Sequence, residues 1–568
     1  MDSPPSRGPS RELILKRSRL AFAAVVVFGA TIRFHGLDWG LPWSFHIDER
    51  LFVVGKAILL ERSVADGGVP NAGITSYGIL PLWLLVAARQ CLLPLVQRCV
   101  DAVHGDAFAG TVLLARWISA VWGIGAILLI RQWGLRWGRG TALTAAALAA
   151  GFPALVQASH FGTVEAPLVA FVVAGLWAAE RLAERPSAAR AVAGGVVLGL
   201  AASVKSPGVL LALPLMHAAL SRREGAALRI AIGAGVAAAV ALLLNPALLP
   251  WLGGGNPGAG AGEHTTLIGN LRRAYSPDFH DWTLPYARAI PGWWEATRIL
   301  PYAVGILPAL AAAAGTVLCV RRRKARDQRL LLMLVPLVVL LLAARVKTVR
   351  FLLPALPALA ILAAEAARMF GERFERFRVS APAALALSTM AAGLAFTAVY
   401  AGPDTRVAAA RWLDRNVTGD EVIALEDPPG YGPPLGSPVP ELRRPRHRVE
   451  MLWNRFYTGH ERRTETERAR HLSRILDRCD VLALSEGHRA EFTAAPELRP
   501  VEAAFYADLD AGRLPFRRVA VFESEPRLGP VILSDGGAEP LMRVFDHPRI
   551  EIWRKAAAPS DAAPGGAK

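Results

Sequence analysis

The sequence predicts a polytopic α-helical membrane protein with a small C-terminal α/β domain. Apolar residues gather in runs of about 17–23, the length at which a helix crosses a hydrocarbon core of about 30 Å. Only 20% of the 568 residues are charged while 53% are hydrophobic, and the mean hydropathy is +0.32. After about residue 400 the long runs stop, and short β-rich stretches alternate with helical ones.

The first apolar stretch, residues 20–32, follows a basic N-terminal segment and has no small-residue cleavage site after it. This pattern predicts an uncleaved span with residues 1–18 as a cytoplasmic tail. The membrane domain then occupies residues 19–400. Further apolar segments lie near residues 79–97, 111–131, 141–158, 166–183, 190–204, 207–220, 227–250, 298–320, 329–345, 350–370 and 379–400.

Loop charge predicts the topology. Arginine and lysine gather in five loops, at residues 131–139, 181–190, 221–229, 321–329 and 368–378. All five loops fall on the cytoplasmic side only if residues 79–97 do not cross the membrane. That segment contains Pro81, Arg89 and Pro94, which suit a helix lying along the outer membrane surface. About eleven spans then remain, and their odd number places the C-terminal domain outside the cytoplasmic membrane.

Charge and cysteine usage exclude other classes of protein. The net charge of +17 lies mostly in these short loops and no groove-reading motif accompanies it, so nucleic acid is not predicted as a partner. The four cysteines are scattered without metal-ligand spacing. This excludes a disulfide framework and argues against a zinc or redox site.

Residues 401–556 form the predicted extracytoplasmic α/β domain. An amphipathic helix is expected at residues 404–416 and another helical stretch at 460–478. Short runs rich in β-forming residues predict strands at residues 421–426, 481–486, 518–524 and 549–555. The Ala-, Pro- and Gly-rich tail, residues 557–568, is predicted to be disordered.

Carboxylates at the membrane surface are the first candidates for catalysis. Asp48 and Glu49 follow the first span, and an adjacent pair beside an apolar surface can serve as a general base. The alternative is a solvated helix start. Glu165, with His160 nearby, could orient an acceptor, hold a metal or pair with a cation, or simply begin the next helix.

Cations form the second group. Lys205 lies in a Pro-Gly hinge between two short apolar segments, and Arg345, Lys347 and Arg350 lie between two later spans. Their predicted position on the outer side is an exception to the positive-inside rule and suits the binding of a phosphate group. The alternative is that these side chains snorkel to lipid headgroups.

A few further residues complete the predicted outer surface. Arg116 could pair with Asp48 or Glu49, or snorkel. Glu263 and His264, in a long outer loop, could bind an acceptor or a metal, or be ordinary surface residues.

Several stretches resemble membrane glycosyltransferases of the GT-C fold, in particular family 39, which holds the protein O-mannosyltransferases and the lipid A aminoarabinose transferases. The stretches are residues 33–49, 74–85, 115–129, 160–171, 199–214 and 346–362, within roughly residues 15–400. The resemblance implies a polyprenyl-phosphate-linked sugar donor and an inverting transfer.

The resemblance also implies roles for individual residues. Asp48 matches the acidic residue taken as catalytic base, and Glu165 matches a second acidic position. Lys205, Lys347 and Arg350 match cations expected near the carrier phosphate. Glu263 and His264 are similar to a Glu-His pair of the aminoarabinose transferases.

The chain departs from the family around Tyr77. The stretch from Ser76 to Ile79 has neither the carboxylate of the aminoarabinose transferases nor the His-Pro-Pro of the protein O-mannosyltransferases. Neither substrate is therefore carried over, no cofactor is predicted, and a bound divalent metal is disfavoured. Tyr77, His160, Arg116, Glu263 and His264 stay candidates for the acceptor or loop site.

These observations predict a glycosyltransferase in the cytoplasmic membrane that uses a polyprenyl-phosphate sugar donor and a lipid, glycan or protein acceptor. A flippase for an anionic lipid and a non-catalytic assembly subunit are the alternatives. Inverted repeats and charges at mid-membrane would favour the flippase, but no repeat is evident and the charges are predicted at one face.

Overall fold

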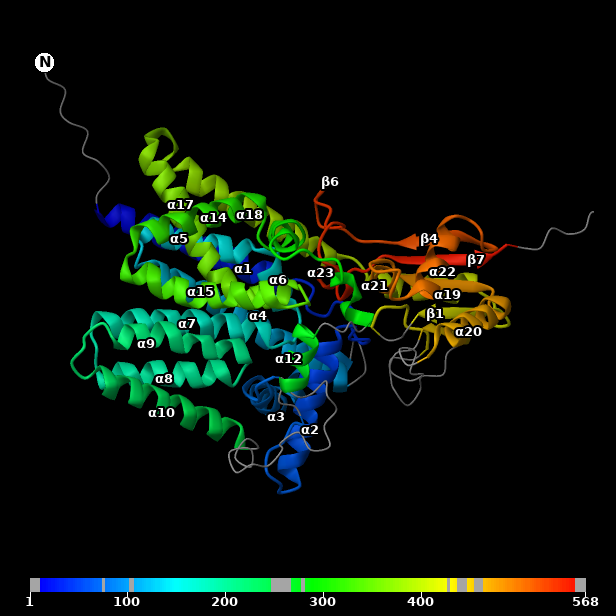
Figure 1. Cartoon of the computed structure of the whole chain (residues 1–568), viewed down its shortest axis with the longest axis horizontal. Coiled ribbons are helices and arrows are strands. Elements are labelled where there is room, and N and C mark those ends of the chain that lie inside the picture. Colours follow the sequence, from blue (N-terminus) through cyan, green and yellow to red (C-terminus); the bar gives the residue numbers. More distant parts are fainter. Residues whose placement is uncertain are drawn as a thin grey trace, which may run out of the picture.

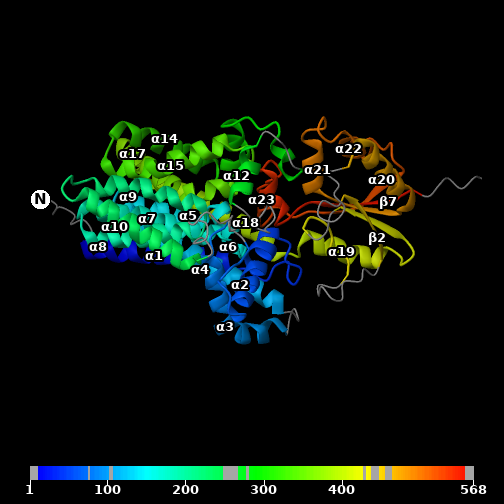
Figure 2. The same cartoon turned by 60° about the horizontal axis from the view of Figure 1, so that its bottom comes forward.

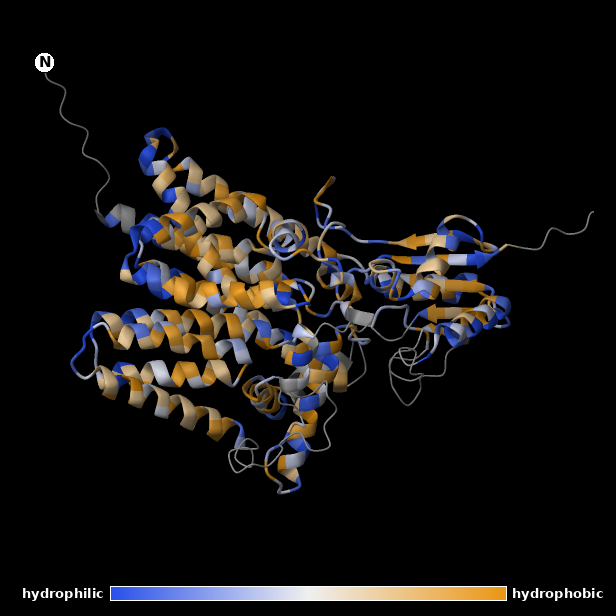
Figure 3. Ribbon diagram, viewed as in Figure 1, coloured by the Kyte–Doolittle hydropathy of each residue, from blue (hydrophilic) through white to orange (hydrophobic). Residues whose placement is uncertain are grey.

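A computed structural model describes residues 11–73, 77–101, 107–246, 267–276, 281–426, 430–436, 447–453 and 463–556. A large helical domain occupies one part of the molecule and a smaller sheet-containing domain lies at one end of its helices (Figure 1). This arrangement confirms the predicted fold class. Helices of the first domain are apolar along most of their length, with hydrophilic residues at their ends (Figure 3).

The long and medium helices of the membrane domain run roughly alongside one another. They are α1 (Arg11–Phe34), α4 (Ala107–Gly134), α5 (Arg139–Gly151), α6 (Pro153–His160), α7 (Glu165–Glu184), α8 (Ala188–Ala202), α9 (Ala212–Ala219), α10 (Ala226–Leu244), α14 (Ile306–Arg322), α15 (Ala325–Ala343), α17 (Leu356–Arg373) and α18 (Ser380–Thr397). By length and composition, five helical stretches of the described residues could span a membrane, or seven if each of two bent pairs is one span. The count of about eleven spans stays a prediction.

Small residues bring these helices into close contact. A Cβ on Gly315 of α14 would lie 2.1 Å from the carbonyl oxygen of Leu362 in α17. A Cβ on Gly393 of α18 would lie 2.5 Å from the carbonyl oxygen of Gly151, where α5 ends. Glycine at such crossings lets backbones approach within a membrane, where packing rather than the hydrophobic effect drives helix association.

The five basic loops gather at one end of the membrane domain. They connect α4 to α5, α7 to α8, α9 to α10, α14 to α15 and α17 to α18, and all lie at the end away from the C-terminal domain (Figure 1). The helix that begins the described chain, α1, starts at that end too. The shared end agrees with the loop-charge prediction.

The opposite end carries shorter elements. The π-helical turn η1 (Asp48–Val54) leads into α2 (Gly55–Ala65), and α3 (Leu80–Asp101) follows. Figure 1 shows α3 nearly end-on while the bundle helices lie across the view. The α3 helix therefore runs across the bundle, and its described part Leu80–Leu92 is a short apolar helix. This geometry agrees with the prediction that residues 79–97 do not cross.

Within its described residues, the C-terminal domain is built on a five-stranded sheet in the order β2-β1-β3-β7-β4. The three strands β2 (Arg448–Trp453), β1 (Val422–Glu426) and β3 (Val481–Ser485) are parallel, while β7 (Ile550–Lys555) is antiparallel to both β3 and β4 (Phe516–Phe522). The four strands predicted from the sequence are confirmed, whereas β2 was not predicted. The predicted disordered tail lies outside the described residues.

Helices cover both faces of this sheet (Figure 2). One face packs against α20 (Glu465–Arg478), α21 (Glu486–Thr493) and α22 (Pro500–Asp510) around a buried core that includes Trp453. The other face packs against α19 (Thr405–Asn416), the helix predicted at residues 404–416, which Asp404 caps. Two short strands, β5 (Arg527–Leu528) and β6 (Val531–Ile532), and the short helix α23 (Pro540–Val544) complete the domain.

The two domains join through buried polar contacts. Gln157 of α6 donates from Nε2 to the Met542 carbonyl at 2.7 Å and to Asp546 Oδ2 at 2.8 Å. The Tyr400 hydroxyl donates to the same Asp546 oxygen at 3.0 Å. The His46 ring stacks on Phe545 with centroids 4.2 Å apart. The C-terminal domain is thus anchored beside the loop that leads to Asp48.

Candidate active site

Asp48 and Glu49 open the turn η1, and both side chains are buried. Successive residues of a helical turn point in directions about 100° apart, so two adjacent carboxylates reach different neighbours. The two predicted catalytic carboxylates therefore contact different side chains.

Glu49 is held in a buried ion pair with Arg116 of α4. Its Oε1 lies 2.8 Å from Arg116 Nε, and its Oε2 lies 2.9 Å from Arg116 Nη2. Oε1 also accepts the backbone N–H of Gly162 at 2.7 Å. The same guanidinium donates to the carbonyls of Leu37 and Trp39. Of the alternatives for Arg116, pairing with Glu49 is the one found, and Glu49 serves to fix the loop between α1 and η1.

Asp48 faces a second cluster. Its Oδ2 is ion-paired with Nη1 of Arg350, which lies in the short helix α16 (Val349–Leu352), and it accepts the Tyr77 hydroxyl at 3.3 Å. Arg350 Nη2 in turn lies 3.3 Å from the Tyr77 oxygen. Burial raises the pKa of Tyr77, so this hydroxyl stays a proton donor at neutral pH.

Glu165 joins the same cluster from the start of α7. Its Oε1 lies 2.6 Å from Nη2 and 3.1 Å from Nε of Arg350, and 3.0 Å from Nζ of Lys205. The Lys205 ammonium also lies 5.2 Å from the centre of the Tyr77 ring. Glu165 is only 1% exposed, so its charge depends on these two cations. Asp48, Tyr77, Glu165, Lys205 and Arg350 together form what we call the carboxylate–cation cluster.

A backbone contact explains how Tyr77 and Lys205 meet. The N–H of Gly78 donates to the Val204 carbonyl at 3.0 Å, and the N–H of Leu80 donates to the Ser203 carbonyl at 3.0 Å. The segment that precedes α3 therefore lies directly on the hinge between α8 and the 3-10 turn η2 (Ser206–Leu211).

Asn245, at the end of α10, fastens the same contact. It accepts the Ile79 N–H at 3.2 Å, and its amide nitrogen lies 3.3 Å from the Ser203 hydroxyl. Sequence reasoning missed this residue. A lone asparagine that ends an otherwise apolar run was the available signal.

Lys347 turns away from this cluster. Its Nζ donates to the carbonyls of Leu342 and Ala344 at 3.1 and 3.0 Å, where α15 ends, and it forms an ion pair with Glu295 at 3.2 Å. A lysine bound to the last carbonyls of a helix is a common C-terminal stabiliser. The structure thus separates Lys347 from Arg350, with which the sequence had grouped it. Arg345 has an exposed side chain, and its backbone N–H donates to Ala274.

The remaining candidates fall outside the cluster. His160 lies with Nδ1 2.9 Å from the Val156 carbonyl and Nε2 2.9 Å from the His35 carbonyl, and its ring stacks on Tyr400. Its contacts are those of a packed core histidine. Glu263 and His264 lie outside the described residues. Within the described parts of the chain, no group of three or more His, Cys, Asp or Glu residues is placed to hold a metal.

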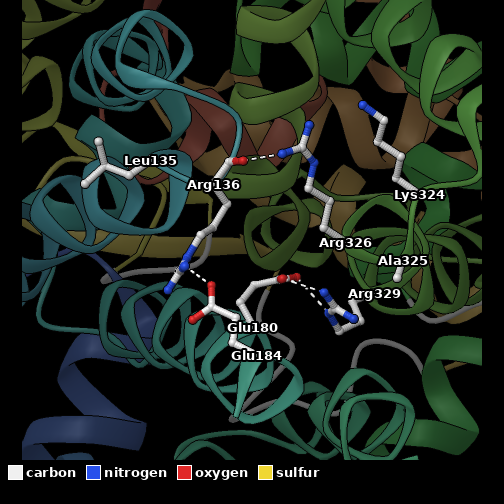
Figure 4. Close-up of a pocket in the computed structure, with 8 residues that line it drawn as sticks. All are labelled: Leu135, Arg136, Glu180, Glu184, Lys324, Ala325, Arg326 and Arg329. Carbon is white, nitrogen blue, oxygen red and sulfur yellow. Dashed lines mark hydrogen bonds and ion pairs between the residues drawn. The ribbon is translucent and has the colours of Figure 1, made fainter. Parts of the chain in front are cut away.

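A separate charged pocket lies at the far end of the bundle, among the basic loops (Figure 4). Arg136 pairs with Glu184, and Arg329 pairs with Glu180 at 2.5 Å. Arg326 donates to the Arg136 carbonyl. Lys324 and Arg326 leave the pocket with a net positive charge beyond these two ion pairs, and it lies away from the carboxylate–cation cluster.

A family model described as dolichyl-phosphate-mannose-protein mannosyltransferase matches residues 94–251. This segment resembles that glycosyltransferase family. The match confirms the resemblance predicted from the sequence. The segment contains Arg116, Glu165 and Lys205, two of which belong to the carboxylate–cation cluster.

Solved structures of similar proteins include two that span most of the chain. ArnT from Cupriavidus metallidurans in the apo state is 14% identical, with a TM-score of 0.48 over 95% of this chain and 98% of that chain. The apo oligosaccharyltransferase of Archaeoglobus fulgidus is 14% identical, with a TM-score of 0.47 over 91% and 75%. The S. cerevisiae protein O-mannosyltransferase Pmt1-Pmt2 complex bound to the sugar donor is 20% identical, with a TM-score of 0.32 over 41% and 34%. No curated protein matches the sequence.

Proposed function

We propose that this chain is an inverting glycosyltransferase that moves a sugar from a polyprenyl-phosphate donor to a hydroxyl of a lipid, glycan or protein acceptor. The observation that carries the proposal is the carboxylate–cation cluster. It brings two buried carboxylates, a tyrosine and two cations from separate parts of the chain to one place at the end of the helices nearest the C-terminal domain. The family match to residues 94–251 supports the same class of reaction.

Arg350 and Lys205 are the proposed partners of the donor phosphate. A guanidinium offers a planar set of donors that can hold two phosphate oxygens at once, and an ammonium adds a second point charge. In the described structure these donors face Asp48 and Glu165. A phosphate would compete with the carboxylates for Arg350, so donor binding would loosen the Arg350–Asp48 ion pair.

Asp48 is the proposed general base. The acceptor oxygen attacks the anomeric carbon opposite the phosphate, the bond from that carbon to the phosphate oxygen breaks, and the phosphate leaves with the electron pair. Asp48 takes the proton of the acceptor hydroxyl. Release of the Arg350 ion pair leaves an Asp48 oxygen open to accept this proton, while Tyr77 keeps the carboxylate oriented by its hydrogen bond.

The test replaces the proposed base without changing its shape. We expect Asp48→Asn to lower the transfer rate by about 10²–10⁴-fold, the contribution typical of general bases, while the affinity for undecaprenyl phosphate stays the same or rises because Arg350 no longer pairs with a charged Asp48. Transfer is measured with the purified protein from a panel of polyprenyl-phosphate-linked hexoses and pentoses to acceptors extracted from the source membranes.

Asp66→Asn is the matched control, because Asp66 follows α2 on the same side of the molecule with an exposed side chain. It should transfer at the wild-type rate. Undiminished transfer by Asp48→Asn would remove the assignment of the base. Movement of the lipid across the bilayer by the wild type without a glycosylated product would favour a flippase instead.

A further inference from the structure

Glu539 of the C-terminal domain is a fully buried carboxylate that the proposed chemistry does not use. Its Oε1 accepts the Thr348 hydroxyl at 3.0 Å and the backbone N–H of Val349 at 3.0 Å. These two residues directly precede Arg350. A side chain from the C-terminal domain therefore holds the segment that presents the central cation of the cluster.

The other oxygen of Glu539 is equally engaged. Oε2 accepts the Tyr286 hydroxyl at 2.9 Å and the backbone N–H of Leu541 at 2.9 Å, so the carboxylate also caps its own helix, α23. Burial raises the pKa of Glu539, and these hydrogen bonds oppose that shift. Four donors converge on one buried carboxylate, which is the condition under which such a group is tolerated in a protein interior.

The Arg350 segment depends on outside support. The α16 helix is a single turn that follows an extended Thr348, and one isolated turn has little stability of its own. Before it, the Lys347 side chain binds the end of α15 and Glu295, and the Trp294 indole donates to the Lys347 carbonyl at 3.2 Å. Lys347 fixes the entry to the turn, and Glu539 fixes its first residues.

We propose that Glu539 is a positioning residue that sets the direction of Arg350 toward the donor phosphate, and thereby makes the phosphate site depend on the docked C-terminal domain. This inference rests on the proposed function. It gives the C-terminal domain a defined part in donor binding, through two hydrogen bonds to the segment that carries the phosphate-binding arginine.

Removal of the carboxylate tests the proposal. We expect Glu539→Ala to weaken the affinity for undecaprenyl phosphate in detergent micelles by about 10- to 100-fold, because small misplacements of a binding group have costs of this order. Glu497→Ala is the matched control, since Glu497 also joins the C-terminal domain to the 281–297 region, through Arg288 at 2.7 Å, but does not touch the Arg350 segment. Its affinity should equal that of the wild type.

Two further variants distinguish a loss of binding from a loss of folding. Thr348→Val removes the hydroxyl that donates to Glu539 and that also accepts the backbone N–H of Arg350 at 3.4 Å, and it should weaken binding in the same direction. Glu539→Gln should recover part of the affinity, because its amide oxygen can still accept from Thr348 and Val349 while its NH2 group cannot accept from Tyr286 and Leu541. A purely structural role would instead give affinities that follow the melting temperatures of the variants.

Hydrogen exchange at the Val349 amide separates failure of this inference from failure of the proposed function. Glu539→Ala should increase exchange there, whatever the protein binds. Faster exchange with unchanged affinity, while Arg350→Lys weakens binding, would overturn the positioning role of Glu539. Unchanged affinity in both Glu539→Ala and Arg350→Lys would overturn the phosphate site itself.

Discussion

At the scale of single residues, two neighbours in the chain have unlike surroundings. Glu49 is surrounded by hydrogen-bond donors from Arg116, Gly162 and Ser44. Asp48 shares its arginine with Glu165 and also meets a tyrosine. A carboxylate with a dedicated arginine stabilises the fold, whereas one that shares its cation can lose it to an incoming anion. From this difference we propose a structural role for Glu49 and a chemical role for Asp48.

The structural role of Glu49 predicts a large loss of stability. Glu49→Ala leaves the Arg116 guanidinium buried without its counter-ion, which costs about 3–5 kcal/mol. The Glu497→Ala change breaks an exposed pair and should cost about 0–1 kcal/mol. Denaturant titration of the purified protein in detergent measures the free energy of unfolding. A loss below that of the exposed pair would show that Glu49 does not fix this loop.

At the scale of elements, the cluster depends on how closely one segment lies on another. The strand-like contact between residues 77–80 and the Ser203–Val204 backbone joins the segment before α3 to the hinge after α8. A Cβ on Gly78 would lie 2.0 Å from the Ser203 carbonyl oxygen, which is far inside van der Waals contact. Only glycine permits this approach, and the approach places Tyr77 beside Lys205.

Gly78→Ala should therefore separate the two segments. We expect a destabilisation of about 1–3 kcal/mol, typical of overpacking, together with a marked fall in transfer because Tyr77 and Lys205 move apart. Gly125→Ala, in the middle of α4 with open space around the added methyl group, should be neutral or slightly stabilising. Wild-type stability and transfer in Gly78→Ala would contradict the proposed contact.

At the scale of the whole molecule, charge divides the two ends of the membrane domain. The five basic loops occupy one end, and the C-terminal domain, η1, α2 and α3 occupy the other (Figures 1 and 3). The positive-inside rule assigns the basic end to the cytoplasm. We therefore propose that the cluster and the C-terminal domain face the outer side of the cytoplasmic membrane.

Cysteine labelling tests this orientation. In a background with all four native cysteines replaced by serine, Ser534→Cys in the C-terminal domain should react with a membrane-impermeant maleimide on intact spheroplasts. Lys324→Cys, in the loop between α14 and α15, should react only after permeabilisation. Both positions have exposed side chains, so access alone distinguishes them. The reverse pattern would invert the proposed topology.

Much of this architecture could be predicted from the sequence because its signals are local. Apolar runs predicted the helices, loop charge predicted which ends lie together, and short runs rich in β-forming residues predicted β1, β3, β4 and β7. The strand β2 was missed because its stretch RVEMLW contains two charged residues and follows a Pro- and Arg-rich segment, so it lacks the continuous apolar run of β1 and β3. The members of the cluster were each predicted, since charged or polar residues at the membrane surface are conspicuous.

The sequence by itself determined the class of protein, its division into two domains and which ionisable residues are candidates for the active site. The tertiary structure decided which of them meet: Arg350 reaches Asp48 across 302 positions, Lys347 turns toward Glu295, and Glu539 supports the Arg350 segment. The physical reason is the distance along the chain over which each signal acts. Hydrophobic periodicity and loop charge act over a few turns of one helix, whereas ion pairing depends on side-chain direction and on the path of the whole chain, which no local pattern contains.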